Sequence, residues 1–426
     1  MKFLLEEIDR YEKRIRKIKE NPDPTKPKSN FLLYELERDL RKAQLEAWQN
    51  GKYFATGLYP AALINALGFE VLDPIMAADR TSGPRAAQYM SQVRSLGLPE
   101  QVCERTAIYI PMILNNDFPK PHFILASNWE CECIPLSGVL LGKLLDVPIY
   151  YIDVSFEADN ETLTYVTEQF REMIEFAEKK FPGIKYDEEK LIALQEIDKA
   201  WYEVWKEIYQ LRKIRPCPIA GREAFREPRA PSFYPDPKRA LEYLRTYRDE
   251  IKVMAEEGIG AVKEEKLRVM WAVSGPFFAD PFRFLEEKGV SIPYWHIGEG
   301  SRFSGARFPF YGDKSEYGRK LSPLEDEARM FNSSAWGGLG KRWIEDTIFL
   351  CRDLSIDALI YYQLWGCTVT VNLGKIVADA VEKELGIPTL LVEGRCLDQE
   401  SFDQRELENK LADFIEMCLA RREGGN

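Results

Sequence analysis

The chain has 426 residues and a formal net charge of −11, with 58 Lys and Arg against 69 Asp and Glu. This length exceeds one ordinary core, and the acidic balance without any basic block argues against a nucleic-acid surface and favours a cytoplasmic protein. No apolar run reaches about 18 residues, so no segment is predicted to cross a membrane. Eight cysteines are too few for a secreted disulfide scaffold and are expected to be buried, metal-binding or catalytic.

Apolar periodicity and the positions of proline and glycine predict alternating helices and strands in the first half of the chain. In order these are two helices within 1–50, a strand at 52–58, helices at 60–67 and 100–114, a strand–loop–helix–strand unit within 119–154, and helices within 161–215. The helix at 100–114 would place Cys103 one turn from its start, where the helix dipole favours a thiolate.

Residues 119–154 form the clearest unit of the sequence. An apolar strand ends near Ser127, a loop follows with Cys131 and Cys133, and an apolar helix leads to a second strand. Ligands of open α/β sheets bind where the parallel strands end, so thiols at this place are candidates for chemistry.

The second half repeats this alternation after a boundary rich in proline and arginine at 220–237. The predicted elements are helices at 237–257, 281–288, 341–354, 370–385 and 401–421 and strands at 268–274, 290–298, 358–362 and 389–393. The segment 299–339 lacks a clear pattern and is expected to be a lid or an interface segment. The prediction is an α/β fold with a helical segment at 1–50, a first α/β domain at 51–220 carrying Cys103 and Cys131, and a second at 221–426 carrying Cys367.

Two cysteines occupy equivalent places in the two halves. Cys367 follows its strand as Cys131 follows the strand before it, so both thiols would lie at carboxyl ends of strands. Together with Cys103, three thiolates could meet at a domain interface, which suits an iron–sulfur cubane or an open zinc site. The alternative is that these cysteines are inert and buried, the more frequent state of scattered cysteines in a cytosolic enzyme.

The other cysteines divide into two groups. Cys351 and Cys418 lie on apolar helix faces and are expected in the core. Cys133, Cys217 and Cys396 stay unassigned, although Cys396 lies just beyond a predicted strand and is kept as an additional ligand.

Further motifs bear on the chemistry mainly by their absence. The sequence has no Gly-x-Gly-x-x-Gly loop, no Gly-x-x-x-x-Gly-Lys-Ser/Thr loop and no Gly-x-Ser-x-Gly elbow, so these routes to dinucleotide binding, ATP hydrolysis and serine catalysis are not expected. His122 and His296 are expected to be structural, although His296, near the long segment, could donate a proton.

Three stretches follow one another in an order that resembles a known family. They are Gly51-Lys-Tyr with Tyr59-Pro-Ala-Ala-Leu-Ile-Asn-Ala-Leu-Gly68, then Gly97-Leu-Pro-Glu-Gln-Val-Cys103 leading to Ala126-Ser-Asn-Trp-Glu-Cys131, and Cys367 with Glu382-Lys-Glu-Leu-Gly-Ile-Pro388 and Glu393-Gly-Arg-Cys-Leu-Asp398. The family is that of the 2-hydroxyacyl-CoA dehydratase and class I benzoyl-CoA reductase subunits, and the last stretch is most similar to the benzoyl-CoA reductase B- and C-type subunits.

This resemblance implies two flavodoxin-like (Rossmann-like) parallel-sheet domains and one [4Fe-4S] cluster held by Cys103, Cys131 and Cys367. It further implies an iron–sulfur catalytic subunit of an ATP-dependent aromatic acyl-CoA reductase, which passes low-potential electrons to a thioester such as benzoyl-CoA in ketyl radical chemistry during anaerobic aromatic degradation. The implied partners are a homologous second catalytic subunit, a separate ATP-hydrolysing iron–sulfur activator, a ferredoxin-type electron donor upstream and the aromatic acyl-CoA substrate. No nucleic-acid or membrane partner is implied.

Two positions depart from the family pattern. Ala62 stands where many relatives carry a glutamate, and Arg395 stands where benzoyl-CoA reductase subunits usually carry an aspartate. The loss of two carboxylates argues against acid–base chemistry in this chain and leaves it to the partner.

Three alternatives remain open. The chain could be a subunit of a 2-hydroxyacyl-CoA dehydratase, which removes a hydroxyl without net reduction. It could hold two linked clusters, with Cys133, Cys217 and Cys396 recruited beside the first three cysteines. It could also be a metal-free scaffold subunit whose cysteines belong to the core.

Overall fold

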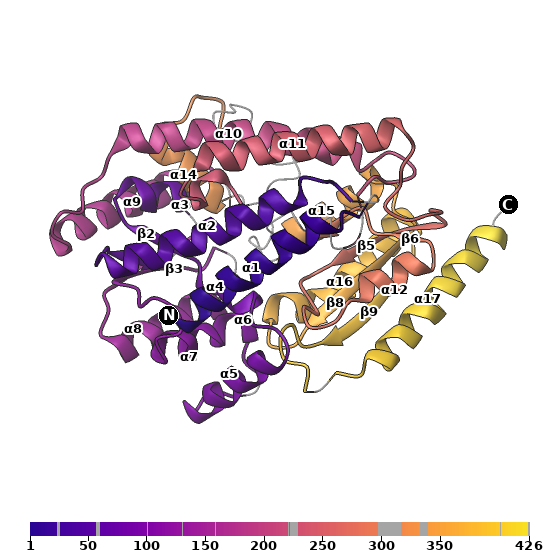
Figure 1. Cartoon of the computed structure of the whole chain (residues 1–426), viewed down its shortest axis with the longest axis horizontal. Helices are drawn as coiled ribbons and strands as arrows, with labels where there is room; N and C mark the ends of the chain where they lie inside the picture. The colour runs from indigo at the N-terminus through magenta and orange to yellow at the C-terminus, as the bar shows by residue number, and fades with distance from the viewer. Residues whose placement is uncertain are drawn as a thin grey trace.

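A computed structural model of the chain describes residues 1–23, 26–56, 60–99, 101–129, 131–157, 159–219, 221, 229–296, 317–332, 340–400 and 402–424. These residues form two sheets with helices around them, and all the strand pairings among them are parallel (Figure 1). The predicted α/β class with two parallel sheets is confirmed. None of the helices described is long and apolar enough to cross a membrane.

The first sheet has the strand order β2-β1-β3-β4. Its strands are β1 (Phe54–Thr56), β2 (Glu70–Leu72), β3 (Phe123–Ser127) and β4 (Ile149–Ile152). Helix α8 (Cys133–Leu145) connects β3 to β4, as the strand–helix–strand pattern predicts, and Ile124 lies opposite Ile149 in the register. The helices that follow or precede these strands are α3 (Ala61–Ala66), α4 (Pro74–Asp79), α5 (Pro84–Ser95), α6 (Glu104–Ala107), α7 (Tyr109–Leu114) and α9 (Asn160–Lys180). We call this sheet with these helices the N-terminal lobe.

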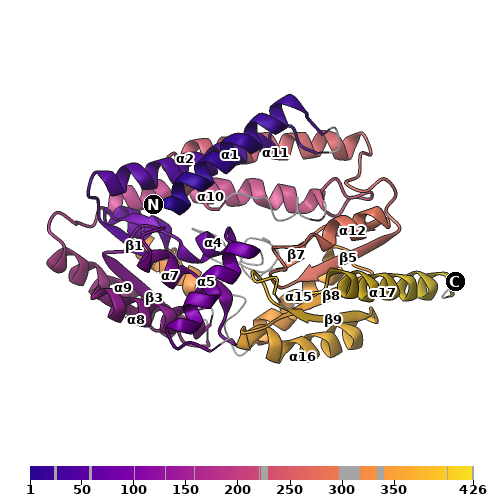
Figure 2. The same ribbon diagram turned by 60° about the horizontal axis from the view of Figure 1, so that its bottom comes forward.

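The second sheet has the order β6-β5-β8-β9, with β7 also paired to β5. Its strands are β5 (Leu267–Ala272), β6 (Val290–Ser291), β7 (Trp295–His296), β8 (Ala358–Leu364) and β9 (Thr389–Gly394). With α12 (Pro281–Glu287), α15 (Lys341–Asp353), α16 (Thr368–Leu385) and α17 (Gln404–Gly424) it makes the C-terminal lobe. Figure 2 shows the two sheets next to each other.

Two predicted elements are interrupted in the structure. The single strand expected at 290–298 is two short strands along one edge of β5, because Pro293 between them has no N–H to donate to the ladder. The helix expected at 100–114 is split into α6 and α7, and α6 begins only at Glu104. Cys103 is therefore the residue before α6 and does not lie one turn inside a helix.

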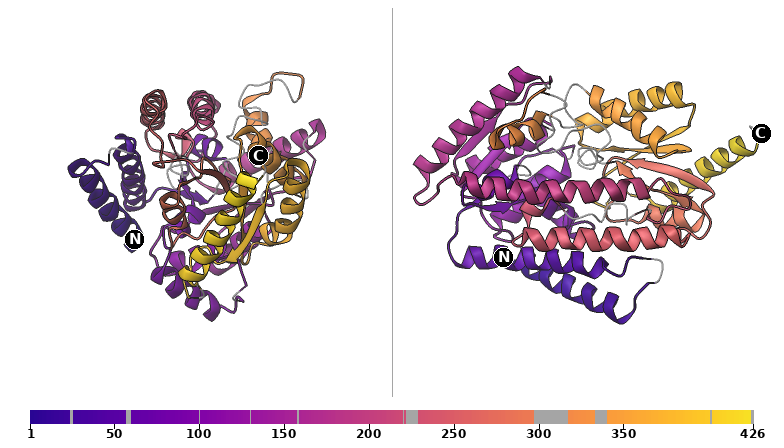
Figure 3. Two further views of the ribbon diagram at one scale, coloured as in Figure 1. Left: turned by 90° about the vertical axis from the view of Figure 1, so that its right-hand side faces the viewer. Right: turned by 90° about the horizontal axis from the view of Figure 1, so that it is seen from above.

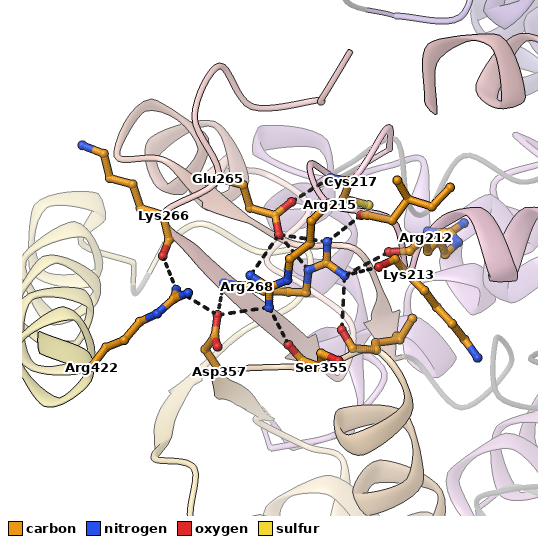
Figure 4. Close-up of polar contacts among 12 residues, drawn as sticks. Arg212, Lys213, Arg215, Cys217, Glu265, Lys266, Arg268, Ser355, Asp357 and Arg422 are labelled. Atoms are coloured by element: carbon orange, nitrogen blue, oxygen red, sulfur yellow. Dashed lines mark hydrogen bonds and ion pairs between the residues drawn. The ribbon is translucent and has the colours of Figure 1, made fainter. Parts of the chain in front are cut away.

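A buried arginine fastens two helix ends to the second sheet. The side chain of Arg268, in β5, is fully buried and donates from Nη2 to the Ile214 carbonyl at 2.7 Å and from Nε to Glu265 Oε1 at 2.9 Å (Figure 4). Its Nη1 atom donates to the carbonyls of Arg212 and Leu354, which follow α10 (Glu188–Leu211) and α15. Helix ends leave carbonyls without intrahelical partners, and one guanidinium satisfies several of them here.

A layer of four helices runs along both lobes. Helices α1 (Lys2–Glu20) and α2 (Asn30–Gln49) pack on each other, α2 packs on α11 (Pro237–Glu256), and α11 packs on α10 (Figure 3). A 3₁₀ turn at Pro231–Phe233 precedes α11, and the Tyr234 hydroxyl donates to buried Glu37 at 2.8 Å. The helices on either side of residue 220 therefore pack together, and the division at 220–221 stays a prediction.

Helix α14 (Pro323–Asn332) belongs to the second half of the sequence but packs on the N-terminal lobe. The Phe331 ring lies 5.3 Å from the rings of Trp129 and Phe170, and Gln195 donates to Glu327 at 2.7 Å. The segment 299–339 shows no clear sequence pattern, yet part of it forms α14, and its role as a lid or an interface segment stays a prediction. Its remainder, 299–316 and 333–339, lies outside the described residues.

Candidate functional site

The three predicted ligands lie where helices begin. Cys103 immediately precedes α6, Cys131 precedes α8 by two residues after β3, and Cys367 immediately precedes α16 after β8. Backbone N–H groups of the first helical turns face these sulfurs, from Thr106 to Cys103, from Ile134 to Cys131 and from Thr370 to Cys367. The exposed N–H groups of a helix start favour a negatively charged sulfur, which is the form that binds metal.

The structure brings these thiols together, and Cys133 with them. The Cys131 and Cys133 side chains hydrogen-bond each other, and negative charge at Cys103 or Cys367 raises the pKa of Cys131. Negative charge at Cys367 or Cys133 raises the pKa of Cys103, and negative charge at Cys133 raises the pKa of Cys367. All six pairs among the four thiols are therefore within electrostatic reach. We call these four residues the thiol cluster.

Gly366 allows the lobes to approach so closely at this point. Its φ is +83°, and a Cβ atom on it would lie 2.6 Å from the Val102 carbonyl oxygen and 2.8 Å from the Cys103 nitrogen. A residue without a side chain is needed for both reasons. The Gly366 carbonyl also lies 3.9 Å from Cys133 Sγ, within reach of a weak S–H donor.

The thiol cluster is too deeply buried for several of its thiols to be ionised at once unless a cation lies among them. Burial, together with the charge of Cys367, raises the pKa of Cys103 to about 12. The Cys133 thiol and burial raise the pKa of Cys131 well above its usual range, and burial raises the pKa of Cys367. The hydrogen bond from Cys131 lowers the pKa of Cys133 to about 7. A bound cation would offset the repulsion between neighbouring thiolates, because a thiol that coordinates a metal is deprotonated.

Glu104 joins the thiol cluster to the opposite lobe. Its fully buried carboxylate accepts at Oε2 from the backbone N–H groups of Cys396, Leu397 and Asp398 at 3.1, 2.7 and 3.3 Å. Its Oε1 accepts from Arg395 Nη1 at 3.0 Å. Burial raises the pKa of Glu104 although these hydrogen bonds oppose that shift. The departure at Arg395 thus has a partner, the acidic residue next to Cys103.

Two further side chains beside the cluster escaped the sequence analysis. Arg105 forms a two-pronged ion pair with Asp79, at 2.8 and 2.7 Å, and its charge favours the Cys103 thiolate. The Tyr109 hydroxyl hydrogen-bonds Ser137 of α8 and lies within electrostatic reach of Cys103 and Cys131. The charged pair that directly follows Cys103 in the sequence was the available signal for Arg105.

Other cysteines lie away from the cluster or behind it. Cys217 lies in the Arg268 network (Figure 4), where its thiol donates to the Ile219 carbonyl at 2.7 Å. Arg268 lies near the start of β5, whereas Cys367 of the thiol cluster follows the end of the parallel strand β8. Cys351 and Cys418 are buried, as expected for core residues. Cys396 is fully buried next to Asp79, Glu104, Arg105 and Cys103.

The two histidines have structural surroundings. Nδ1 of His122 accepts the Phe54 N–H at 3.1 Å. The His296 ring is fully buried, stacks on Trp343 at 3.8 Å and lies 3.7 Å from the Asp346 carboxylate. Burial lowers the pKa of His296 to about 3, so the ring is neutral near pH 7 and is not the imidazolium that acts as a general acid.

Soft thiolate donors suit either an iron–sulfur cluster or a zinc ion. Among the residues described, no group of three or more His, Cys, Asp or Glu side chains is arranged around a single ion position. Ligands of one zinc ion must converge on it at about 2.3 Å, whereas a cubane of four irons takes its thiolates at separate corners.

The family model of the 2-hydroxyglutaryl-CoA dehydratase D-component matches residues 57–418. The chain belongs to this family. The match includes all members of the thiol cluster and confirms the family resemblance seen in the sequence. The particular closeness to benzoyl-CoA reductase subunits remains a prediction.

Full-length relatives of this family are subunits of dehydratases. The (R)-phenyllactyl-CoA dehydratase alpha subunit of Clostridium sporogenes is 19% identical over 95% of this chain and 98% of the relative. The (R)-2-hydroxyisocaproyl-CoA dehydratase alpha subunit of Clostridioides difficile is 21% identical over 92% of this chain and 96% of the relative. The alpha subunit of (R)-2-hydroxyglutaryl-CoA dehydratase from Acidaminococcus fermentans is 20% identical over 72% of this chain and 62% of the relative.

Proposed function

We propose that this chain is an iron–sulfur subunit of a 2-hydroxyacyl-CoA dehydratase. The observation that carries the proposal is the meeting of four thiols from both lobes in a chain whose full-length relatives are dehydratase alpha subunits. The overall reaction removes water from a 2-hydroxyacyl-CoA and gives an enoyl-CoA, so no reductant is consumed in net terms.

Cys103, Cys131 and Cys367 would hold a [4Fe-4S] cluster, which supplies low-potential one-electron chemistry when it is bound. The chain itself contributes the surroundings. Glu104 and Arg395 hold the Cys103 segment against the C-terminal lobe, and burial of Cys103 keeps water from it. Exclusion of water and hydrogen bonds near the sulfurs are the means by which a protein sets a cluster's potential.

Acid–base chemistry on the substrate is assigned to another subunit. Ala62, at the position where many relatives carry a glutamate, is buried in α3 and provides no carboxylate. The proposal therefore includes a homologous second subunit that binds and deprotonates the acyl-CoA, and a separate ATP-hydrolysing activator that delivers the electron. The alpha-subunit names of the relatives support a multi-component enzyme.

A second candidate is the aromatic acyl-CoA reductase, favoured by the sequence likeness of residues 382–398 to that branch. The two candidates differ in their use of electrons. A dehydratase would turn over many substrate molecules after one reduction, whereas a ring reductase would consume two electrons for each aromatic acyl-CoA. Turnover counted against the reductant supplied, with the chain, its partner and an activator, separates them.

The placement of Cys217 weighs against two linked clusters. That alternative recruits Cys217, whose thiol lies in the Arg268 network at the other end of β5. About eight irons per chain would restore it, whereas about four support the single cluster.

The first experiment measures iron and acid-labile sulfide in the full chain purified without oxygen, with EPR after reduction. We expect about four irons and a reducible cubane signal. Cys131→Ala and Cys367→Ala should each abolish loading, whereas Cys418→Ala, in the core, should load as the unchanged chain does. A colourless chain without iron would overturn the proposed function in favour of a metal-free scaffold.

A further inference from the structure

Three arginines lie where the helical layer meets the N-terminal lobe. Arg41 of α2 is fully buried, whereas Arg229, before the 3₁₀ turn, and Arg80, directly after α4, are mostly buried. Two of them lie beside one carboxylate oxygen, because Arg229 Nη2 is 3.7 Å and Arg41 Nη2 is 3.9 Å from Glu37 Oε2. We call Glu37 and these three arginines the arginine group.

Several buried donors of the arginine group have no hydrogen-bond acceptor among the residues that the structure describes. They are Nε and Nη2 of Arg41, Nε and Nη2 of Arg229, and Nε of Arg80. The buried hydroxyl of Tyr11 in α1, within electrostatic reach of Arg80, has no hydrogen-bond partner there either. Folded proteins leave few buried polar groups in this state, so a set of this size points to an acceptor other than the side chains described.

The charges of the arginine group are also unequal. Arg229 pairs through Nη1 with Asp73 Oδ2 at 3.1 Å. Burial would raise the pKa of Glu37, but the three guanidinium groups lower it to about 2, so this carboxylate is ionised. Three guanidinium groups therefore lie beside two carboxylates, those of Glu37 and Asp73.

The other carboxylates close to the arginine group already have cationic partners. Glu7 pairs with Arg10, and Asp79 pairs with Arg105. Water could accept hydrogen bonds from the donors, but it would leave the excess positive charge in place. Because buried charges in proteins are paired, an anion with several oxygens satisfies both requirements.

The donors favour a tetrahedral oxyanion. Guanidinium groups bind phosphate through paired N–H donors, and here the donors come from separate segments, namely α1, α2, the end of α4 and the residues before the 3₁₀ turn. A tetrahedral ion accepts hydrogen bonds from many directions, whereas a carboxylate accepts them mainly in one plane. Tyr11, Glu37 and Arg41 are buried, which suits a small free ion and not the end of a larger ligand.

We propose that the arginine group binds a free inorganic phosphate ion, which ties the helical layer to the N-terminal lobe. The bound ion offsets the excess positive charge and accepts hydrogen bonds from Arg41, Arg229 and Arg80. The site shares no residue with the thiol cluster, so the inference does not rest on the proposed function.

The test measures phosphate on the full chain purified without oxygen. The chain is dialysed against inorganic phosphate in a chloride buffer of constant ionic strength, and the phosphate in excess of the outer solution is assayed after the chain is unfolded. We expect about one phosphate per chain, and a melting temperature that rises with phosphate but not with an equal ionic strength of chloride. Arg41→Gln should lose both effects, whereas Arg16→Gln, exposed on α1, is the matched control and should keep them.

Three results would overturn the inference. One is the absence of phosphate above the level of the outer solution. Another is equal binding by Arg41→Gln and the unchanged chain, which would place the ion elsewhere. A third is a rise in melting temperature with CoA that Arg41→Gln abolishes, since the arginines would then hold the phosphate of a larger ligand. Iron content is measured separately, so failure of this inference leaves the proposed function to its own test.

The site can also be tested if Arg41→Gln does not fold. Tyr11→Phe removes a single hydroxyl and should weaken the affinity for phosphate several-fold. Crystals of the unchanged chain grown with arsenate, a phosphate analogue, should show the anomalous signal of arsenic between Arg41 and Arg229. Ordered water alone at that place would contradict the inference.

Discussion

Single residues next to the thiol cluster hold the two lobes at a fixed separation. Glu104 accepts three backbone N–H groups and one guanidinium from residues 395–398, all with one buried carboxylate. A buried carboxylate without such partners would cost several kcal/mol in desolvation. The adjacent Cys103 is thereby positioned by contacts with the opposite lobe.

Glu104→Ala should destabilise the chain by about 3–5 kcal/mol, because the three N–H groups and Arg395 lose their buried acceptor. Glu104→Gln keeps an acceptor oxygen and should cost less. Urea unfolding provides the measurement, with Glu406→Ala on the exposed face of α17 as the control. Equal effects of Glu104→Ala and Glu406→Ala would refute this role. A double variant with Arg395→Gln should show coupling above about 0.5 kcal/mol.

Gly366→Ala should push the lobes apart at the thiol cluster. Its φ of +83° strains an alanine by about 1–2 kcal/mol, and the clash with the Val102 carbonyl adds about 1–3 kcal/mol. Gly386→Ala is the matched control, since its φ of +69° gives the same strain but a Cβ there meets nothing within 4 Å. We expect a lower melting temperature for both and a loss of iron for Gly366→Ala alone. Equal iron contents would exclude a role for this close approach.

At the scale of elements, short polar contacts fix how the helical layer is seated. Asp198 of α10 is buried and accepts the Ser232 backbone N–H at 2.9 Å, in the 3₁₀ turn before α11. Burial raises the pKa of Asp198 to about 7. The carboxyl therefore keeps its proton in the folded chain at a pH where an unfolded aspartate has lost it.

This raised pKa predicts a stability that falls as the pH rises. The folded state binds the Asp198 proton more tightly than the unfolded state, whose pKa is about 3.9, so the contribution is complete below pH about 4. It is lost as the pH increases to about 7 and amounts to at most about 4 kcal/mol. Urea unfolding between pH 4 and 8 measures it. Asp198→Asn should flatten the dependence, whereas Glu196→Gln, exposed on the same helix, should leave it unchanged; an unaltered slope in Asp198→Asn would contradict the assignment.

The sequence predicted the helices and strands better than the contacts between them. Strong apolar patterns marked the helices around Leu191 and the strand–helix–strand unit with Cys131, because periodicity reports local burial. The break in the strand at Pro293 and the split of the helix after Cys103 were not predicted. Propensity summed over a stretch of residues does not show where contact with a sheet edge or with the second lobe interrupts a strand or a helix. The Glu104 contact joins residues nearly 300 positions apart, and no local pattern encodes that pairing.

At the scale of the whole molecule, the thiol cluster is built from residues of both lobes. Cys103, Cys131 and Cys133 belong to the N-terminal lobe, and Cys367 belongs to the C-terminal lobe. A metal cluster bound across such a boundary adds its binding free energy to the stability of the folded arrangement.

Under the proposed function, removal of iron by a chelator should therefore lower the melting temperature by several degrees. Amide hydrogen exchange should rise most at α6 and at the starts of α8 and α16, where the ligands lie. Cys367→Ala is the control, because its exchange should be the same with and without the chelator. Unchanged exchange in the iron-loaded chain after chelation would show that the lobes do not depend on the metal.

Helix α14 has a consequence for the order in which the chain folds during synthesis on the ribosome. Trp129 and Phe170 are made early, but Phe331, which lies against both rings, leaves the ribosome some 160 residues after Phe170. Domains made first usually fold first during synthesis. Here the N-terminal lobe cannot complete its core until the first strands of the C-terminal lobe have been translated. The nascent chain should therefore expose an aromatic surface for several seconds, at about 5–20 residues per second, and should bind chaperones during that interval.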